Sequence, residues 1–132
     1  MPEVRIKVEE ELMTAGNPSK WSKLEQLPYL SAVILETIRL SYGVATRLPR
    51  IAPDETLAYK GEFQGKLVQH VIPPGTAISM SSVIMHANQD IFPEPDNFRP
   101  ERWLNEDGTR RKELEGYLIS FSKGTRQCLG IK

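Results

Sequence analysis

The chain has 132 residues, of which 39% are hydrophobic, so it is long and apolar enough for one folded domain. Seventeen basic residues balance 17 acidic ones, so no net charge favours nucleic acid or an anionic membrane as a partner. No stretch approaches the ~20 apolar residues that cross a bilayer. The single cysteine excludes an internal disulfide, and His70 and His86 lack zinc-type spacing, so any metal must use few protein ligands.

The first third of the chain predicts two helices. Pro2 suits a first helical position, apolar residues recur at every fourth place after it, and Gly16 and Pro18 end the pattern. A brief turn is expected over residues 21–27. A longer helix is predicted over about residues 28–42. One face of this helix carries the apolar residues Leu30, Val33, Ile34 and Ile38.

Short segments rich in β-branched and aromatic residues follow the second helix. Prolines and glycines interrupt them, which predicts small β elements over about residues 46–81. A turn at residues 73–75 separates residues 69–72 from residues 76–81, and we expect these two segments to pair as a hairpin. The pattern as a whole predicts a mainly α fold with small β-sheets, of the α+β class.

Prolines shape the next part of the chain. Pro93, Pro95 and Pro100 prevent both a continuous helix and a central strand. We therefore expect an ordered, irregular meander over about residues 90–120.

Residues 121–130 carry a motif with the spacing F-x-x-G-x-R-x-C-x-G. Its fixed positions are Phe121, Gly124, Arg126, Cys128 and Gly130. The motif resembles the haem-binding signature of the cytochrome P450 family. A chance match at five fixed positions is expected in roughly one chain in tens of thousands.

The resemblance gives each residue of this haem-binding loop a role. Cys128 becomes the catalytic thiolate that ligates the haem iron and donates electron density to it. Gly124 and Gly130 let the backbone turn and approach the porphyrin closely. Arg126 pairs with a haem propionate, and Phe121 shields the sulfur from water.

Two further motifs of the same family occur upstream of the loop. Glu36 and Arg39 match its E-x-x-R helix motif, and a spacing of three places them on one helix face. The segment 100–103 resembles the family's P-E-R-F sequence, with Trp103 at the position of the usual phenylalanine. The resemblance implies that Arg102 joins Glu36 and Arg39 in a structural cluster that holds the meander on the helix.

The segment 41–48 is interpreted by the same resemblance. Arg47 stands where the family often has a second arginine that binds a haem propionate; a plain surface arginine is the alternative. Gly43, Val44 and Ala45 are small and lie where relatives contact substrate, although a simple turn from helix to strand explains them equally. His70 and His86 are interpreted as surface histidines.

The resemblance implies a haem-thiolate monooxygenase. Its cofactor is haem b with Cys128 as axial ligand, and NADPH supplies electrons indirectly through a reductase. Its partners are O2, an apolar small-molecule substrate and that reductase, and they include no nucleic acid. The chain itself gives no location; for a full-length eukaryotic parent, of the fungal microsomal type that the sequence most resembles, the endoplasmic reticulum membrane is expected.

Members of this family are several times longer, so we expect residues 1–132 to be a partial domain. The distal oxygen-activating helix is expected upstream, and a helix beneath the haem is expected after Lys132. One alternative is a truncated, non-catalytic remnant. Another is a parent enzyme that performs a rearrangement or a peroxide-driven reaction.

Overall fold

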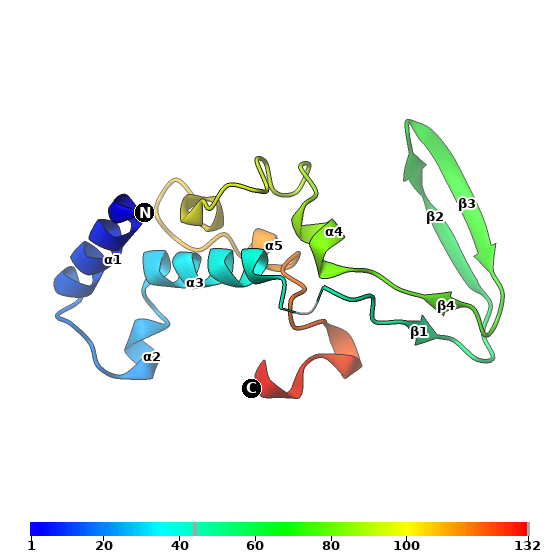
Figure 1. Cartoon of the computed structure of the whole chain (residues 1–132), viewed down its shortest axis with the longest axis horizontal. Coiled ribbons are helices and arrows are strands. Elements are labelled where there is room, and N and C mark those ends of the chain that lie inside the picture. The colour runs from blue at the N-terminus through cyan, green and yellow to red at the C-terminus, as the bar shows by residue number, and fades with distance from the viewer. Residues whose placement is uncertain (44, 132) are drawn as a thin grey trace. The chain divides into compact units, whose positions relative to one another are not determined.

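A computed structural model describes residues 1–43 and 45–131 of the chain. The chain divides into two compact units. The first comprises Met1–Ala45 and Ser82–Lys132, and the second is Thr46–Ser81. Helices belong to the first unit and strands to the second (Figure 1). Helices with small antiparallel sheets confirm the predicted α+β class.

The first unit is built mainly from short helices. Its described elements are α1 (Pro2–Thr14), α2 (Trp21–Leu24), α3 (Pro28–Ser41), α4 (Ser82–His86), the 3₁₀ helix η1 (Pro100–Trp103), α5 (Lys112–Glu115) and the 3₁₀ helices η2 (Gly124–Arg126) and η3 (Leu129–Ile131). None of the described helices is long and apolar enough to cross a bilayer.

α1 caps the start of α3. Both carboxylate oxygens of Glu11 accept hydrogen bonds from α3 backbone amides, one from Tyr29 and one from Leu30, each at 2.8 Å. These amides have no acceptor within α3. The negative charge of Glu11 also interacts favourably with the positive N-terminal end of the α3 dipole. At its other end α3 stops at Tyr42, whose φ of 46° is left-handed.

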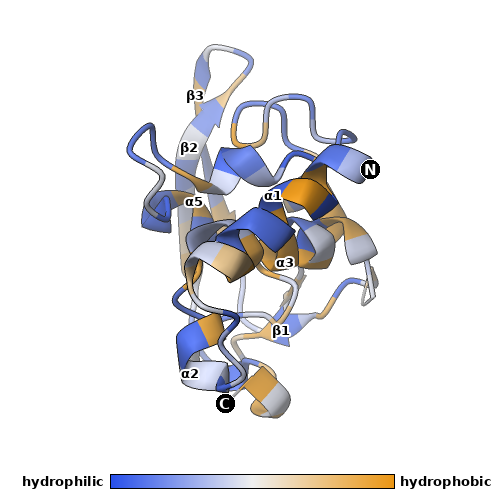
Figure 2. Ribbon diagram, turned by 90° about the vertical axis from the view of Figure 1, so that its left-hand side faces the viewer, coloured by the Kyte–Doolittle hydropathy of each residue, from blue (hydrophilic) through white to orange (hydrophobic). Residues whose placement is uncertain are grey.

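The buried face of α3 differs from the apolar face predicted from the sequence. Ala32, Glu36 and Arg39 are completely buried, whereas Ile34 is 42% exposed. α3 therefore carries hydrophilic as well as hydrophobic residues, as Figure 2 shows. Its charged residues can be buried because they are paired with each other and with groups from the meander.

A small apolar core lies beside this charged face. Its buried members are Ala32, Phe92, Trp103 and Leu114. The ring centroids of Phe92 and Trp103 lie 5.8 Å apart, and this contact joins the start of the meander to η1 within it. The core is small, so hydrogen bonds to buried charges are a large part of what connects α3 to the segments after residue 82.

The second unit contains a long hairpin and a short two-stranded sheet. β2 (Leu57–Phe63) and β3 (Lys66–Ile72) pair along their full lengths across the turn Gln64–Gly65. Both turn residues have positive φ, which suits a tight hairpin. β1 (Arg50–Ile51) pairs with β4 (Ala77–Ile78).

The predicted hairpin between residues 69–72 and 76–81 is therefore wrong. The strand that ends at Ile72 pairs backwards in the chain with β2, and β4 pairs with β1. The turn at Gly65 joins two strands of seven residues each, and this longer pairing satisfies many more backbone groups than the predicted one.

Candidate functional site

The cysteine loop, residues 121–130, closes on itself through backbone hydrogen bonds. The Cys128 amide donates to the Phe121 carbonyl oxygen at 2.8 Å, and the Gln127 amide donates to the Gly124 carbonyl oxygen at 3.2 Å. A turn precedes them, in which the Ser122 amide donates to the Ile119 carbonyl oxygen at 2.9 Å. These bonds bring the first and eighth residues of the motif together, and Cys128 is exposed at the surface.

The two glycines of the motif lie in different backbone conformations. Gly124 has a φ of +75°, in the left-handed region that strains other residues. Gly130 has no such requirement, but a Cβ atom there would lie 3.8 Å from the Cys128 sulfur. Gly124 thus permits the turn, whereas Gly130 leaves a position within van der Waals distance of the sulfur without a side chain.

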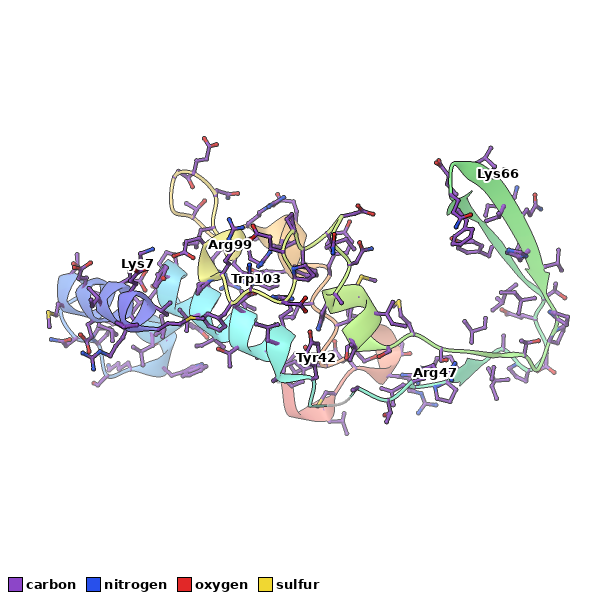
Figure 3. All side chains as sticks on the ribbon, turned by 45° about the horizontal axis from the view of Figure 1, so that its top comes forward. Lys7, Tyr42, Arg47, Lys66, Arg99 and Trp103 are labelled. Atoms are coloured by element: carbon purple, nitrogen blue, oxygen red, sulfur yellow. The ribbon has the colours of Figure 1, made fainter. Side chains whose placement is uncertain are left out.

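The remaining predicted haem contacts are placed as follows. Phe121 is 39% exposed and Arg126 is exposed, so both residues of the loop are accessible from outside. Arg47 is exposed in the second unit (Figure 3), and its pairing with a propionate stays a prediction. Val44 lies outside the described residues.

These features fit a haem ligated by one thiolate. Cys128 is exposed, Gly130 places no side chain beside its sulfur, and Arg126 is an exposed residue that can reach an anionic group. One protein ligand is sufficient because the porphyrin provides four.

Glu36, Arg39 and Arg102 form a buried charge cluster. Arg39 Nε and Nη2 each donate to one oxygen of the Glu36 carboxylate at 2.9 Å, a forked geometry. Arg102 Nε donates to Glu36 Oε1 at 3.0 Å from the other side. The side chains of Glu36 and Arg39 are fully buried and that of Arg102 is 6% exposed. The structure thus brings together the three residues of the predicted cluster.

Two further groups complete the coordination of Glu36, and the sequence reasoning missed both. Trp103 Nε1 donates to Glu36 Oε2 at 2.9 Å, and the Arg99 amide donates to Oε1 at 3.0 Å. Figure 3 labels Trp103 and Arg99 on the segment beside α3. The usual phenylalanine has no indole N–H, so the tryptophan adds a donor and is more than a substitute aromatic ring.

The charge of Glu36 is stabilised despite its burial. Burial alone raises the pKa of a carboxyl group, but the hydrogen bonds and charge of Arg39, with the bond from Trp103, outweigh it. The pKa of Glu36 therefore lies below its ordinary value.

The two arginines also bind backbone carbonyl groups of the meander. Arg39 Nη2 donates to the Pro95 carbonyl oxygen at 2.7 Å, and Arg102 Nη1 donates to the Pro93 carbonyl oxygen at 2.8 Å. Both guanidiniums approach the Asn97 carbonyl oxygen, at 3.4 and 3.3 Å. A segment that cannot form helix or sheet thus has its carbonyl groups satisfied by side chains.

His86 is buried, with 1% of its surface exposed, so its interpretation as a surface histidine is wrong. Nδ1 lies 3.1 Å from the Arg39 carbonyl oxygen, and Nε2 accepts a hydrogen bond from the Ile119 amide at 3.1 Å. Burial, and in addition the charge of Arg39, lower the pKa of His86. Both partners are distant in sequence, so no local pattern could have revealed this role. His70 is exposed, as predicted.

An open hollow in the first unit lies elsewhere. It has a volume of about 630 Å³ and is lined by Met1, Val4, Arg5, Val8, Glu9, Val33 and Phe98. No residue of the cysteine loop lines it.

Comparison with known proteins gives a consistent match. The family model described as Cytochrome P450 matches residues 1–132. The chain is 46% identical over 128 residues to "Cytochrome P450 monooxygenase astB" of Talaromyces wortmannii, covering 97% of this chain and 24% of that protein. It is 45% identical over 144 residues to "Cytochrome P450 monooxygenase ppzE" of Metarhizium rileyi, covering 98% and 37%.

A third relative is named for a different activity. "Conidiogenone synthase PchP450" of Penicillium rubens is 48% identical over 110 residues, covering 83% of this chain and 20% of that protein. The chain thus spans between a fifth and somewhat over a third of the length of these relatives.

Proposed function

Since this chain belongs to the cytochrome P450 family, we propose that it is the haem-binding part of a haem-thiolate monooxygenase in which Cys128 ligates the iron. The observation that carries the proposal is the exposed Cys128, presented by a loop that the hydrogen bond from the Cys128 amide to the Phe121 carbonyl oxygen closes. Residues 1–132 are then a partial domain: helix 28–42, β elements 46–81, meander 90–120 and haem-binding loop 121–130.

Each residue proposed to contact the haem has its own role. Cys128 binds the iron as a thiolate, and Phe121 limits access of water to the sulfur. Arg126 and Arg47 bind the propionates through charge-assisted hydrogen bonds. Gly124 and Gly130 provide the turn and the free space beside the sulfur.

The charge cluster acts through the position of the loop. Glu36, Arg39 and Arg102 hold the meander against α3 and so fix the direction from which the chain enters the loop. Their role is structural, because their polar atoms are occupied by one another, by the Trp103 indole and by backbone groups.

The bound haem b supplies the chemistry by which one oxygen atom of O2 enters an apolar organic substrate. Electrons come from NADPH through a reductase, and no nucleic acid takes part. For a full-length eukaryotic parent of this type, the proposed location is the endoplasmic reticulum membrane. These partners and this location are inferred from the family.

The proposal is tested by Cys128→Ser in the full-length, haem-loaded protein that contains this chain. A serine oxygen cannot replace a thiolate as electron donor, so the thiolate-type spectrum of the carbon monoxide complex should be lost. Thr125→Ser, a conservative change in the same exposed loop, is the control and should keep that spectrum. An unchanged spectrum in Cys128→Ser would refute the assignment.

A further inference from the structure

The hydrogen bonds of His86 define its protonation state. A backbone amide can only donate, so Nε2, which faces the Ile119 amide, carries no hydrogen. A carbonyl oxygen can only accept, so Nδ1, which faces the Arg39 carbonyl, carries the hydrogen. His86 is therefore a neutral imidazole in the Nδ1–H form, with both ring nitrogens engaged.

This ring joins α3 to the entrance of the cysteine loop. The Arg39 side chain returns a bond from Nη1 to the His86 carbonyl oxygen at 2.9 Å, so the two residues hold each other in both directions. At the other ring nitrogen lies Ile119, the first residue of a turn. Its carbonyl oxygen accepts a hydrogen bond from the Ser122 amide at 2.9 Å. Two residues after Ile119, the Phe121 carbonyl oxygen accepts a hydrogen bond from the Cys128 amide.

These hydrogen bonds, together with the backbone of residues 119–122, connect the charge cluster to Cys128. A second bond supports the same attachment, because Ser120 Oγ donates to the Ile38 carbonyl oxygen at 3.3 Å. The ring of Phe92 packs edge-on against the imidazole, with centroids 6.1 Å apart, and fixes its plane.

We propose that His86 is a positioning residue for the haem thiolate: its neutral ring bridges Arg39 and Ile119 and thereby sets where the loop presents Cys128. This inference rests on the proposed function of Cys128 as the iron ligand. It goes beyond that function by assigning a role to a residue outside the haem loop and the charge cluster.

A purely space-filling histidine gives a different expectation. It would need the shape of the ring but not its two polar nitrogens, so a phenylalanine would replace it well. If His86 is a bridge, its replacement must supply one hydrogen-bond donor and one acceptor, about as far apart as the two nitrogens of the imidazole ring. A glutamine side chain offers both groups on one amide, whereas phenylalanine offers neither.

The test compares His86→Phe, His86→Gln and the control His70→Phe in the full-length, haem-loaded protein. His70 is the other histidine of the chain and is exposed on β3, so its variant controls for the same chemical change. Two quantities are measured: hydrogen exchange of the peptide that contains Ile119, and the fraction of the carbon monoxide complex with the thiolate-type spectrum.

We expect exchange at Ile119 to become roughly tenfold faster in His86→Phe, as for the loss of one buried hydrogen bond. The thiolate-type fraction should fall in the same variant and recover at least partly in His86→Gln. His70→Phe should match the unmodified protein in both measurements.

Other outcomes separate the two proposals. If His86→Phe keeps the full thiolate-type fraction, the positioning role is refuted while the ligand role of Cys128 stands. If His86→Phe binds no haem, the glutamine variant decides: recovery supports the bridge, and an equal loss refutes it. If the unmodified protein gives no thiolate-type spectrum, the proposed function itself fails, and this inference fails with it.

Discussion

Glu36 is completely buried in the first unit and is charged. Within the described residues its carboxylate accepts five hydrogen bonds, from Arg39 (two), Arg99, Arg102 and Trp103. A carboxylate has about four lone-pair sites, so both oxygens are fully used. Such a buried charge is tolerated only while its partners stay in place, because removing one leaves the rest incompletely compensated.

At this scale we predict that Trp103→Phe destabilises the protein. The variant keeps an aromatic ring against Phe92 but removes the N–H that donates to Glu36. We expect a loss of about 1–2 kcal/mol in the free energy of unfolding, as for one buried hydrogen bond to a charged group. Denaturant unfolding of the haem-loaded, full-length protein measures it.

The other tryptophan provides the control for this substitution. Trp21 is 72% exposed, so Trp21→Phe should change the free energy of unfolding by less than about 0.5 kcal/mol. Equal effects of the two substitutions would show that the indole hydrogen bond does not contribute to stability.

Sequence alone could identify part of this arrangement. Glu36 and Arg39 are three residues apart, and the helix period predicts that they meet. Arg102 was added only through the family resemblance. Trp103 and His86 could not be assigned, because their partners lie 67 and 47 residues away, and such contacts follow from tertiary packing.

At the scale of elements, α3 is held at its start by a side chain from another helix. Leu27 at the N-cap position makes no side-chain capping bond, and Glu11 of α1 takes over this function. The sequence predicts a helix over about residues 28–42, and α3 spans Pro28–Ser41. The cap from α1 was not predictable, since it depends on how the two helices pack.

We predict that Glu11→Gln weakens this cap. The amide side chain can still accept one hydrogen bond, but it loses the charge that interacts with the α3 dipole. The expected loss is about 1 kcal/mol in the free energy of unfolding. Glu10→Gln is the matched control, because Glu10 is the exposed neighbour on the same helix.

Thermal unfolding of both variants in the full-length protein provides the measurement. The Glu11 variant should melt at a lower temperature than the Glu10 variant. If the two melt together, the charge of Glu11 is not what holds the start of α3.

The β elements show where sequence reasoning about elements failed. The segment 69–72 is a strand, as predicted, but its predicted partner was wrong, because the hairpin was expected at residues 73–75 and its turn lies at Gln64–Gly65. Both residues of the actual turn adopt positive φ, which glutamine does at some cost. The length of the two strands outweighs that local preference.

At the scale of the whole molecule, two buried groups predict the response of stability to pH. The pKa of His86 is lowered in the folded protein, so an unfolded chain takes up a proton below the ordinary histidine pKa of about 6.5 while the folded one does not. Stability should therefore fall as pH falls below that value, by up to ~1.4 kcal/mol per pH unit. Above it, the contribution of His86 is constant.

Glu36 adds a second loss at lower pH. Its folded pKa is also lowered, so its contribution is complete above the ordinary glutamate pKa of about 4.3 and declines as pH falls further. In His86→Gln the loss between about pH 6.5 and 4.5 should become shallower and the loss below it should persist. Chemical unfolding at a series of pH values measures both, and identical slopes in the two proteins would contradict the role given to His86.

The separation in sequence of the groups around Glu36 has a consequence for biosynthesis. Its donors Arg99, Arg102 and Trp103 follow it by 63, 66 and 67 residues. α3 can form locally as soon as it leaves the ribosome, but its buried carboxylate has most of its donors only after residue 103 has emerged. The cysteine loop is synthesised after all of these donors. The loop is therefore completed late, and under the proposed function haem binds only after the donors of Glu36 have been synthesised.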